Sequence, residues 1–350
     1  MTRLLWVLSL AAAAQSFPLG KIIDDVAITK DSAQRYGLYL PSNYSHDRQW
    51  PLILAFDPGG RGRLALDQYQ VAAEKFGYIV AASNVSRNGP WSISTAAAQA
   101  MGEDVTARFR IDERRIYTAG MSGGARVALG VALGSPNLIA GVIASSAGYP
   151  DSTPRKRLPF VLFGTAGSDD FNWLEMRALD RELTTPHRLA VFDGGHVWLS
   201  SELAVEALEW LDFQAMFSGR LQRDEARIKS ICAKLHDAPC DPPPAAYAKA
   251  IKAAQKEIRA EELKERLLLD EIIALEQQLN SPGQRSEAYA KLADQWTRLT
   301  KAAAAADDSP NRRIARRVSR ALSMSPGERA KDAEYVKLVT THRPEREGPR

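Results

Sequence analysis

The sequence predicts a doubly wound, mainly parallel α/β sheet followed by an all-helical C-terminal region. Three features of the chain support this expectation. Apolar runs of strand length alternate with segments of helical periodicity as far as residue 217, which is typical of strands joined by crossover helices. A Gly-x-Ser-x-Gly pentapeptide stands between one such strand and the next helix. Beyond residue 217 strand signals disappear, and alanine, lysine, arginine and glutamate dominate.

The expected strands follow one another in a regular order. Residues 35–40 read as an edge strand, because Pro41 cannot continue a sheet ladder. The later strands are apolar on both faces, as in a parallel sheet that helices cover on both sides. These strands lie at residues 50–56, 78–82, 116–118, 138–144, 158–163 and 187–192, and the helices between and after them at residues 64–76, 96–109, 125–133 and 200–217.

Ser122 is the candidate nucleophile, because it is the central residue of Gly120-Met-Ser122-Gly-Gly124. A serine on a strained turn between strand and helix leaves no room for side chains two residues away, which explains both glycines. A Gly/Ser-rich turn without chemistry is the alternative interpretation. The β-branched and aromatic run before the pentapeptide and the helical pattern after it favour the nucleophile.

A glycine-rich turn, Asp57-Pro-Gly-Gly-Arg-Gly62, directly follows the central strand at residues 50–56. Such a turn can place a backbone N–H against a developing oxyanion, so we expect Gly60 and Gly123 to donate. Gly59 and Arg61 are then expected to line the substrate cleft. Trp91 stands in a turn after the next strand, where it could form a pocket wall or pack as a surface aromatic.

The catalytic base and the acid that orients it should both follow the nucleophile in the sequence. His196 follows the last strand in a glycine-flexible loop, Gly194-Gly-His196, at the same sheet edge as Ser122. The acid should follow the strand at residues 158–163. Asp170 is preferred there to orient the histidine, with Asp169 as the alternate; its neighbour could cap the helix that begins near residue 171. Asp193 is a weaker candidate for the acid, because it is expected to cap the turn in which it lies.

Residues 38–217 resemble the α/β-hydrolase superfamily, with most likeness to its esterase and polyhydroxybutyrate-depolymerase branch. The approach to the nucleophile, residues 109–117 leading into Gly-Met-Ser-Gly-Gly, is similar to that branch. Where many relatives have His-Gly before the oxyanion residue, this chain has Pro58-Gly59-Gly60. The resemblance implies ester hydrolysis through an acyl-enzyme, with Ser122, His196 and Asp170 as the triad. A peptidase or acyltransferase on the same triad is the alternative, as is a scaffold that acts through its helical region.

The first 14 residues have the layout of a secretory signal peptide: a basic residue, a short apolar stretch and small residues at Ala12 and Ala14. A transmembrane anchor is the alternative, but the apolar run is shorter than the roughly 20 residues that a spanning helix needs. We therefore expect an exported protein, periplasmic or secreted. Its expected parts are a signal peptide at 1–14, a hydrolase domain at 20–217, a helical domain at 218–341 and a disordered tail at 342–350.

The charge and the cysteine content of the chain limit the kinds of ligand and partner that can be expected. The chain has 46 Lys and Arg against 42 Asp and Glu, an excess too small to predict nucleic-acid binding. Cys232 and Cys240, the only cysteines, bracket a turn and are expected to form a disulfide in an exported protein, with two free thiols as the alternative. Zinc is not expected, because His236 would add only a third ligand. No cofactor is predicted.

The C-terminal region is predicted to contain several short antiparallel helices. Leu268, Ile272, Leu275 and Leu279 recur at helical spacing and should share one buried face, and residues 292–299 repeat the pattern. The arginines of residues 312–320 are expected to form a solvated helix face, with a protein-binding surface as the alternative. In the hydrolase part, residues 145–157 are too few to form a lid, so we expect an open cleft.

Overall fold

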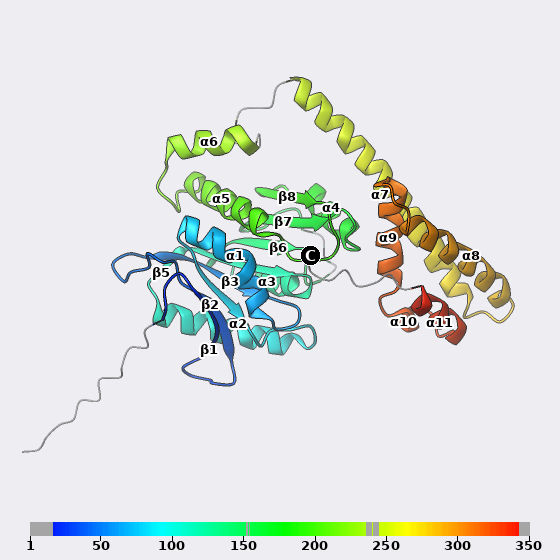
Figure 1. Ribbon diagram of the computed structural model, residues 1–350, viewed down its shortest axis with the longest axis horizontal. Coiled ribbons are helices and arrows are strands. Elements are labelled where there is room, and N and C mark those ends of the chain that lie inside the picture. Colours follow the sequence, from blue (N-terminus) through cyan, green and yellow to red (C-terminus); the bar gives the residue numbers. More distant parts are fainter. Residues whose placement is uncertain (1–16, 152, 154, 236–239, 241–244, 343–350) are drawn as a thin grey trace, which may run out of the picture.

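The computed structural model describes residues 17–151, 153, 155–235, 240 and 245–342. The expected signal peptide at 1–14 and all of the expected tail except His342 lie outside the described residues. The described part contains one eight-stranded sheet with helices on both faces, and a further group of helices beyond one end of the sheet (Figure 1). No helix within this part is long and apolar enough to cross a membrane.

The sheet is mainly parallel and has the strand order β1-β2-β4-β3-β5-β6-β7-β8. Strands β3 to β8 pair in parallel, whereas β1 pairs with β2 and β2 with β4 in antiparallel fashion. The apolar runs of the sequence therefore occupy the parallel, doubly covered part of the sheet, as predicted. The strands are β1 (Ile22–Ala27), β2 (Arg35–Tyr39), β3 (Trp50–Phe56), β4 (Ile79–Ser83), β5 (Ile111–Met121), β6 (Ile139–Ser145), β7 (Val161–Gly167) and β8 (His187–Phe192).

The prediction that residues 35–40 form the edge strand is wrong. Strand β1 lies outside β2 and pairs with it from Ile22 opposite Tyr39 to Ala27 opposite Arg35. The register of β1 shifts between Ile23 and Val26, where Asp24 and Asp25 interrupt the apolar alternation. This interruption conceals the strand in the sequence, because alternation is the main signal of a half-buried strand.

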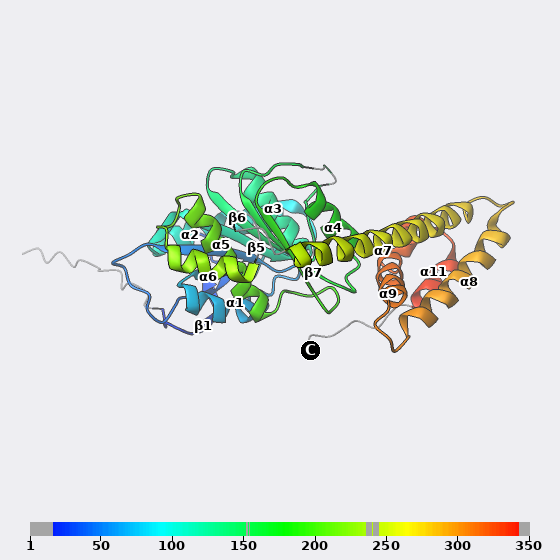
Figure 2. The same ribbon diagram turned by 90° about the horizontal axis from the view of Figure 1, so that it is seen from above.

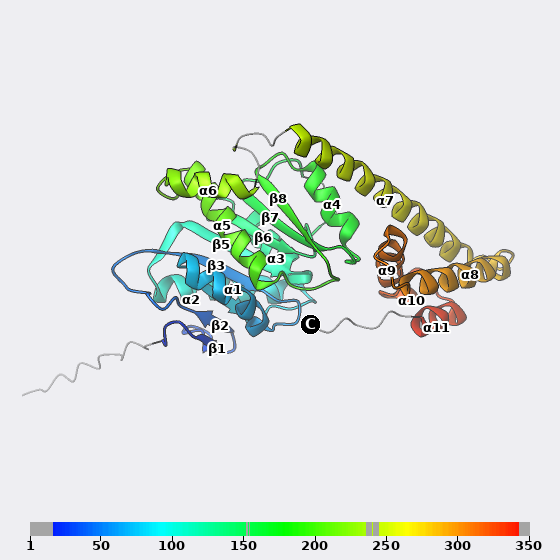
Figure 3. The same ribbon diagram turned by 45° about the horizontal axis from the view of Figure 1, so that its top comes forward.

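Two helical layers enclose the sheet (Figures 2 and 3). Helices α1 (Gly62–Phe76) and α5 (Ser201–Phe217) pack on one face, where Tyr69 and Trp210 belong to one buried cluster. Helices α2 (Trp91–Arg108), α3 (Gly123–Gly134) and α4 (Trp173–Glu182) contribute to the cluster on the other face. The carboxyl ends of the parallel strands thus open onto one edge, where sites form in sheets of this kind.

Among the residues that the structure describes, six helices follow the sheet domain: α6 (Glu225–Leu235), α7 (Ala245–Gln278), α8 (Arg285–Ala303), α9 (Pro310–Leu322), α10 (Pro326–Arg329) and α11 (Ala333–Thr341). Helix α6 packs on α5, and Cys232 forms a disulfide with Cys240, as predicted. The prediction of short helices is wrong for α7, which has 34 residues. No glycine or proline interrupts residues 245–278, so the helix continues beyond the usual length.

The helical region has an apolar core of its own. Ile272 and Leu275 of α7, and Leu279 directly after it, are buried in one cluster with residues of α8 and α9, among them Trp296. Leu268 packs against this cluster. The predicted apolar faces of residues 268–279 and 292–299 are therefore confirmed. The arginines of α9 do not form a solvated face, because Arg317 is buried and the others are at least partly covered.

Candidate active site

Ser122 lies on a sharp turn between β5 and α3. Its φ of +54° and ψ of −122° are strained for a residue with a side chain. Its N–H donates to the Ser145 carbonyl at 2.8 Å, and its own carbonyl accepts from Ala125 N–H at 3.0 Å. A Cβ placed on Gly120 would lie 2.1 Å from the Gly124 carbonyl oxygen, and one placed on Gly124 would lie 1.9 Å from that of Phe56. Both positions therefore require glycine for this turn to pack between β3 and α3.

His196 connects this turn to the loop after β7. Its Nε2 lies 2.8 Å from Ser122 Oγ, and its Nδ1 lies 2.8 Å from Asp170 Oδ1. The imidazole is 18% exposed, and the ring of Phe171 lies 4.1 Å from it between centroids. Three residues that are up to 74 positions apart thus form one continuous chain of hydrogen bonds, with its nucleophile end open to solvent.

Asp170 is the buried end of this chain. Its side chain is 0% exposed, and Oδ1 also accepts from the Asn172 N–H at 2.8 Å. Oδ2 is buried and has no hydrogen-bond partner within the described part of the chain. The backbone holds the residue in place, because the Asp170 carbonyl accepts from Trp173 N–H at 2.8 Å at the start of α4.

Asp169, the alternate acid, has a different role. Its Oδ2 pairs with Arg316 Nη1 at 2.8 Å, and its N–H donates to the Gly194 carbonyl at 2.8 Å. Asp169 does not cap α4, whose N-cap residue is Asn172 and has no side-chain cap bond. The next residue, Asp170, is therefore the carboxylate that reaches the histidine. Asp193 accepts from Ser168 Oγ at 3.3 Å, which ties the two loops together.

The glycine-rich turn after β3 is organised by Asp57, whose side chain is buried. Its Oδ1 accepts from the Gly59 N–H at 2.8 Å and from Arg61 Nε at 2.8 Å. Its Oδ2 accepts from Trp198 Nε1 at 2.9 Å, two residues beyond His196. Asp57 therefore connects the turn to the histidine loop, a contact between residues 141 positions apart that no local pattern indicates.

The expected oxyanion role of Gly60 is not supported by this arrangement. The Gly60 N–H donates to the Asp57 carbonyl at 3.2 Å and closes the turn. The Gly59 N–H is likewise used by Asp57. Gly123 differs, since within the described residues no oxygen accepts from its N–H, which lies at the start of α3 beside Ser122. Gly59 and Gly60 differ from Gly123 because Asp57 accepts hydrogen bonds from the N–H groups of its own turn, as aspartate commonly does.

Asn88 is a site residue that sequence reasoning missed. A Cβ placed on Gly123 would lie 1.7 Å from Asn88 Oδ1 and 3.3 Å from Nδ2, so the side-chain amide lies directly over Gly123. The Asn88 N–H donates to the Pro58 carbonyl at 2.8 Å, which joins its loop to the glycine-rich turn. Its place in the loop after the parallel strand β4 is the only signal for it in the sequence.

Trp91 and Arg61 lie differently from the expectation. Trp91 begins α2, is 45% exposed and places its ring against Gly130 of α3. Gly130 is eight residues beyond Ser122, or about 12 Å along a helix, so the ring is remote from the nucleophile. Arg61 pairs with Asp57, and this ion pair holds the guanidinium against the turn.

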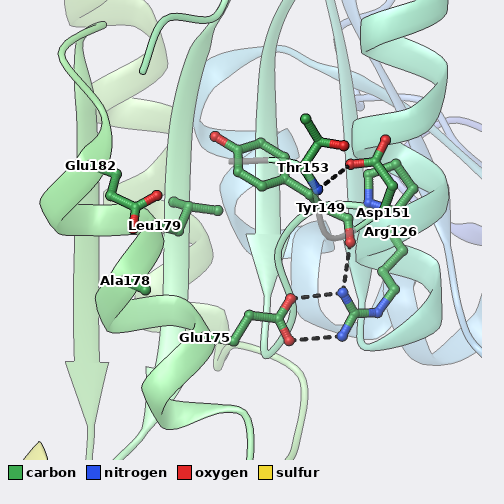
Figure 4. A pocket seen from close by; sticks show the side chains of 9 residues that line it. Arg126, Tyr149, Asp151, Thr153, Glu175, Ala178, Leu179 and Glu182 are labelled. Carbon is green, nitrogen blue, oxygen red and sulfur yellow. Dashed lines mark hydrogen bonds and ion pairs between the residues drawn. The ribbon is translucent and has the colours of Figure 1, made fainter. Parts of the chain in front are cut away.

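A pocket of about 470 Å³ lies beside α3 and α4 (Figure 4). Arg126, one helical turn after Ser122, forms a two-pronged ion pair with Glu175 at 2.7 and 2.8 Å and donates to the Tyr149 carbonyl. Burial raises the pKa of Tyr149 to about 12, so its phenol is neutral at physiological pH. The pocket is lined by Arg126, Tyr149, Pro150, Asp151, Thr153, Glu175, Ala178, Leu179 and Glu182.

No group of three or more His, Cys, Asp or Glu side chains in the described ranges is arranged to hold a metal ion. The sheet order, the strained serine at the end of β5 and the loops after β7 and β8 together define an α/β-hydrolase fold with a Ser-His-Asp arrangement at its carboxyl edge.

Comparison with known proteins gives only distant likenesses. No protein-family model matches the chain, and no curated protein matches it significantly. Among solved structures, a thermostable esterase is 19% identical over 54% of this chain and 62% of its own, with a TM-score of 0.39. A ferulic acid esterase is 16% identical over 55% and 97%, with a TM-score of 0.43. Esterase 2 of Thermogutta terrifontis is 15% identical over 61% and 97%, with a TM-score of 0.42.

The identities are below 20% and the TM-scores below 0.5, so these likenesses assign no activity to this chain. The chain spans less than two thirds of the length of the thermostable esterase. Each of the three structures, taken by itself, leaves more than a third of this chain without a counterpart.

Proposed function

We propose that the protein is a serine hydrolase that cleaves carboxylic esters through an acyl-enzyme on Ser122. The observation that carries this proposal is the unbroken hydrogen-bond chain from Ser122 through His196 to Asp170, with 2.8 Å at both contacts. A serine hydroxyl becomes an effective nucleophile when a base can take its proton and an acid orients that base. The two contacts provide both conditions.

The reaction follows from these positions. Ser122 Oγ attacks the ester carbonyl carbon while His196 Nε2 accepts the hydroxyl proton, and Asp170 stabilises the resulting imidazolium. The tetrahedral intermediate then collapses, and the alcohol leaves with the proton from His196. Water repeats the attack on the acyl-enzyme, again activated by His196, and releases the carboxylic acid and the free serine.

The negative oxygen of the intermediate needs donors aimed at it. We assign one donor to the N–H of Gly123, which no oxygen in the described structure uses. The second is the side-chain amide of Asn88, which lies over Gly123. Which end of an amide carries the nitrogen is set by its hydrogen bonds, so an oxyanion would select the Nδ2 donor.

The test is covalent labelling by a serine-directed fluorophosphonate, followed by intact mass. Wild type should gain one phosphonyl group and hydrolyse soluble short-chain esters, and Ser122→Ala should do neither. Ser92→Ala removes an exposed hydroxyl at the start of α2 and serves as the matched control, which should react like wild type. Labelling that persists in Ser122→Ala would refute the assignment.

Ester preference is the finer part of the proposal, since the same triad also serves amide cleavage and transfer to other acceptors. The esterase branch that the nucleophile region resembles supports it. An ester and an amide with one common acyl group separate the possibilities, because a peptidase would hydrolyse the amide at a measurable rate and an esterase would cleave only the ester. Transfer of the acyl group to an added alcohol in preference to water would instead identify an acyltransferase.

Export is proposed as well. It rests on the signal-like first 14 residues and is supported by the disulfide between Cys232 and Cys240, since such bonds persist in oxidising compartments. Fractionation of cells that express the full chain, with a blot for the processed and unprocessed forms, tests this. Recovery of only the unprocessed form in the cytoplasm would contradict export.

A further inference from the structure

The loop that carries Asp170 is held from two sides. We define the acid loop as Ser168, Asp169 and Asp170. On the first side, the Ser168 N–H donates to the Phe192 carbonyl and the Asp169 N–H to the Gly194 carbonyl, both at 2.8 Å. These bonds join the acid loop to the loop of His196. A displacement of one loop therefore moves the other, and both carry members of the triad.

The second side is formed by α9 of the helical region, which lies beyond α4 (Figures 1 and 3). Arg316 Nη1 pairs with Asp169 Oδ2 at 2.8 Å, and Arg317 Nη1 donates to the Ser168 carbonyl at 2.5 Å. The guanidinium of Arg317 also lies 5.2 Å from the ring of Trp173, and the backbone N–H of Trp173 donates to the Asp170 carbonyl. Two consecutive arginines thus contact both residues that precede the acid.

Arg317 is itself immobilised. It is 1% exposed, and its guanidinium binds Glu265 of α7 at 2.8 Å and Glu261 at 2.8 Å. A buried charge is tolerated only while its partners are in place, so this guanidinium has little freedom to move. Glu262 of the same helix pairs with Arg177 and Arg181 of α4, which anchors α7 next to the acid loop.

We propose that Arg316 and Arg317 are positioning residues for catalysis: through them, the helical region fixes the acid loop and hence the contact between Asp170 and His196. This inference rests on the proposed hydrolase function. It assigns the helical region a part in catalysis by the sheet domain of the same chain. A shift of about 1 Å in a reacting group can cost up to about 10²-fold in rate, so clamping a short loop has a large effect.

The experiment compares kcat and KM for a soluble short-chain ester in full-length variants. Arg316→Gln removes the pair with Asp169 and leaves the buried cluster of Arg317 intact. Asp169→Ala removes the same contact from the other side. Each should lower kcat about tenfold with KM within twofold, because neither residue is assigned to the substrate site. The double variant should be no worse than the more damaged single one, since both changes remove the pair between Arg316 and Asp169.

Arg313→Gln is the matched control. It is on the same helix, and within the described residues its side chain reaches only Glu261 and Asp308, not the acid loop. Its kcat should stay within twofold of wild type. Arg317→Lys is the second probe: it keeps the buried charge but loses the forked contacts, and it should lower kcat at least as much as Arg316→Gln. Thermal unfolding of every variant checks that the fold is retained.

The outcomes separate the two proposals. An unlabelled, inactive wild type would refute the hydrolase function. An active wild type whose folded Arg316→Gln, Asp169→Ala and Arg317→Lys variants keep kcat within twofold would refute the positioning role alone. An equal loss of kcat in the Arg313→Gln control would also refute it, because the effect would then be a general loosening of the helical region.

Discussion

At the scale of residues, the site depends on polar groups that lie beside the triad. Asp57 uses the N–H groups of its own turn and also holds Trp198, so it orders the turn and the histidine loop but removes Gly59 and Gly60 as oxyanion donors. Asn88 then becomes important, because its amide lies over Gly123. The oxyanion site inferred here therefore combines one backbone donor and one side-chain donor.

Asn88→Ala should lower kcat between about 10- and 100-fold with little change in KM. Removal of one oxyanion donor costs about 10²–10³ in a closed site, and the exposure of Asn88 reduces its effect. Steady-state kinetics with a soluble ester measures this. Asn137→Ala, which removes an exposed amide after α3, is the control and should behave like wild type. Unchanged kcat in Asn88→Ala would exclude the side-chain donor.

At the scale of elements, polar side chains cap the helices beyond the sheet domain at their N-termini and connect one helix to another. Ser309 accepts from the Arg312 N–H at the start of α9, and Asp332 accepts from the Tyr335 N–H at 2.9 Å at the start of α11. Asp332 also pairs with Arg285 at 2.7 Å, which fixes α11 to the start of α8. The hydrogen bond from Tyr335 N–H and the pair with Arg285 lower the pKa of Asp332.

Asp332→Ala should destabilise the helical region by about 1 kcal/mol at pH 7, as expected for loss of an N-cap. Asp332→Asn keeps a cap but loses the charge. Because the folded pKa of Asp332 is lowered, its charge stabilises the fold fully above the unfolded value of about 3.9, and this contribution is lost as pH falls through the folded pKa.

Denaturant unfolding followed by circular dichroism at pH 7 and pH 3 measures this effect. The advantage of wild type over Asp332→Asn should shrink at pH 3. Asp307→Asn, at an exposed carboxylate before α9, should show no such change. A constant difference between wild type and Asp332→Asn at both pH values would contradict the role of the charge.

At the scale of the whole molecule, the two parts of the chain meet beside the acid loop. The described residues between β6 and β7 form no helix that could serve as a lid. Ser122 and His196 are both partly exposed. The helical region contacts the sheet domain through α4 and the acid loop, which support the triad from behind its buried end.

Interfacial activation should therefore be absent, because it requires a cover that moves. The rate of hydrolysis of a short-chain ester should rise smoothly with concentration and show no jump at the solubility limit. Initial rates measured across that limit check this, with a lipase known to be interfacially activated as the positive control. An abrupt increase would show that some segment covers Ser122 in solution.

Much of the sheet domain follows from local patterns. The apolar run at residues 50–56 is β3, and the pentapeptide around Ser122 predicted a strand, a turn and a helix that the structure contains. These features depend on neighbours in the chain, so periodicity and glycine spacing are sufficient to find them. Strand β1 was missed because Asp24 and Asp25 interrupt its pattern.

The sequence by itself determined the alternation of strands and helices, the place of Ser122 and the apolar faces of α7 and α8. Only the tertiary structure decided that Asp169 faces Arg316, that Gly60 is engaged by Asp57 and that Asn88 lies over Gly123. The physical reason is the same in each case. A polar group has several possible partners of similar chemistry, and which one it meets depends on how distant segments pack.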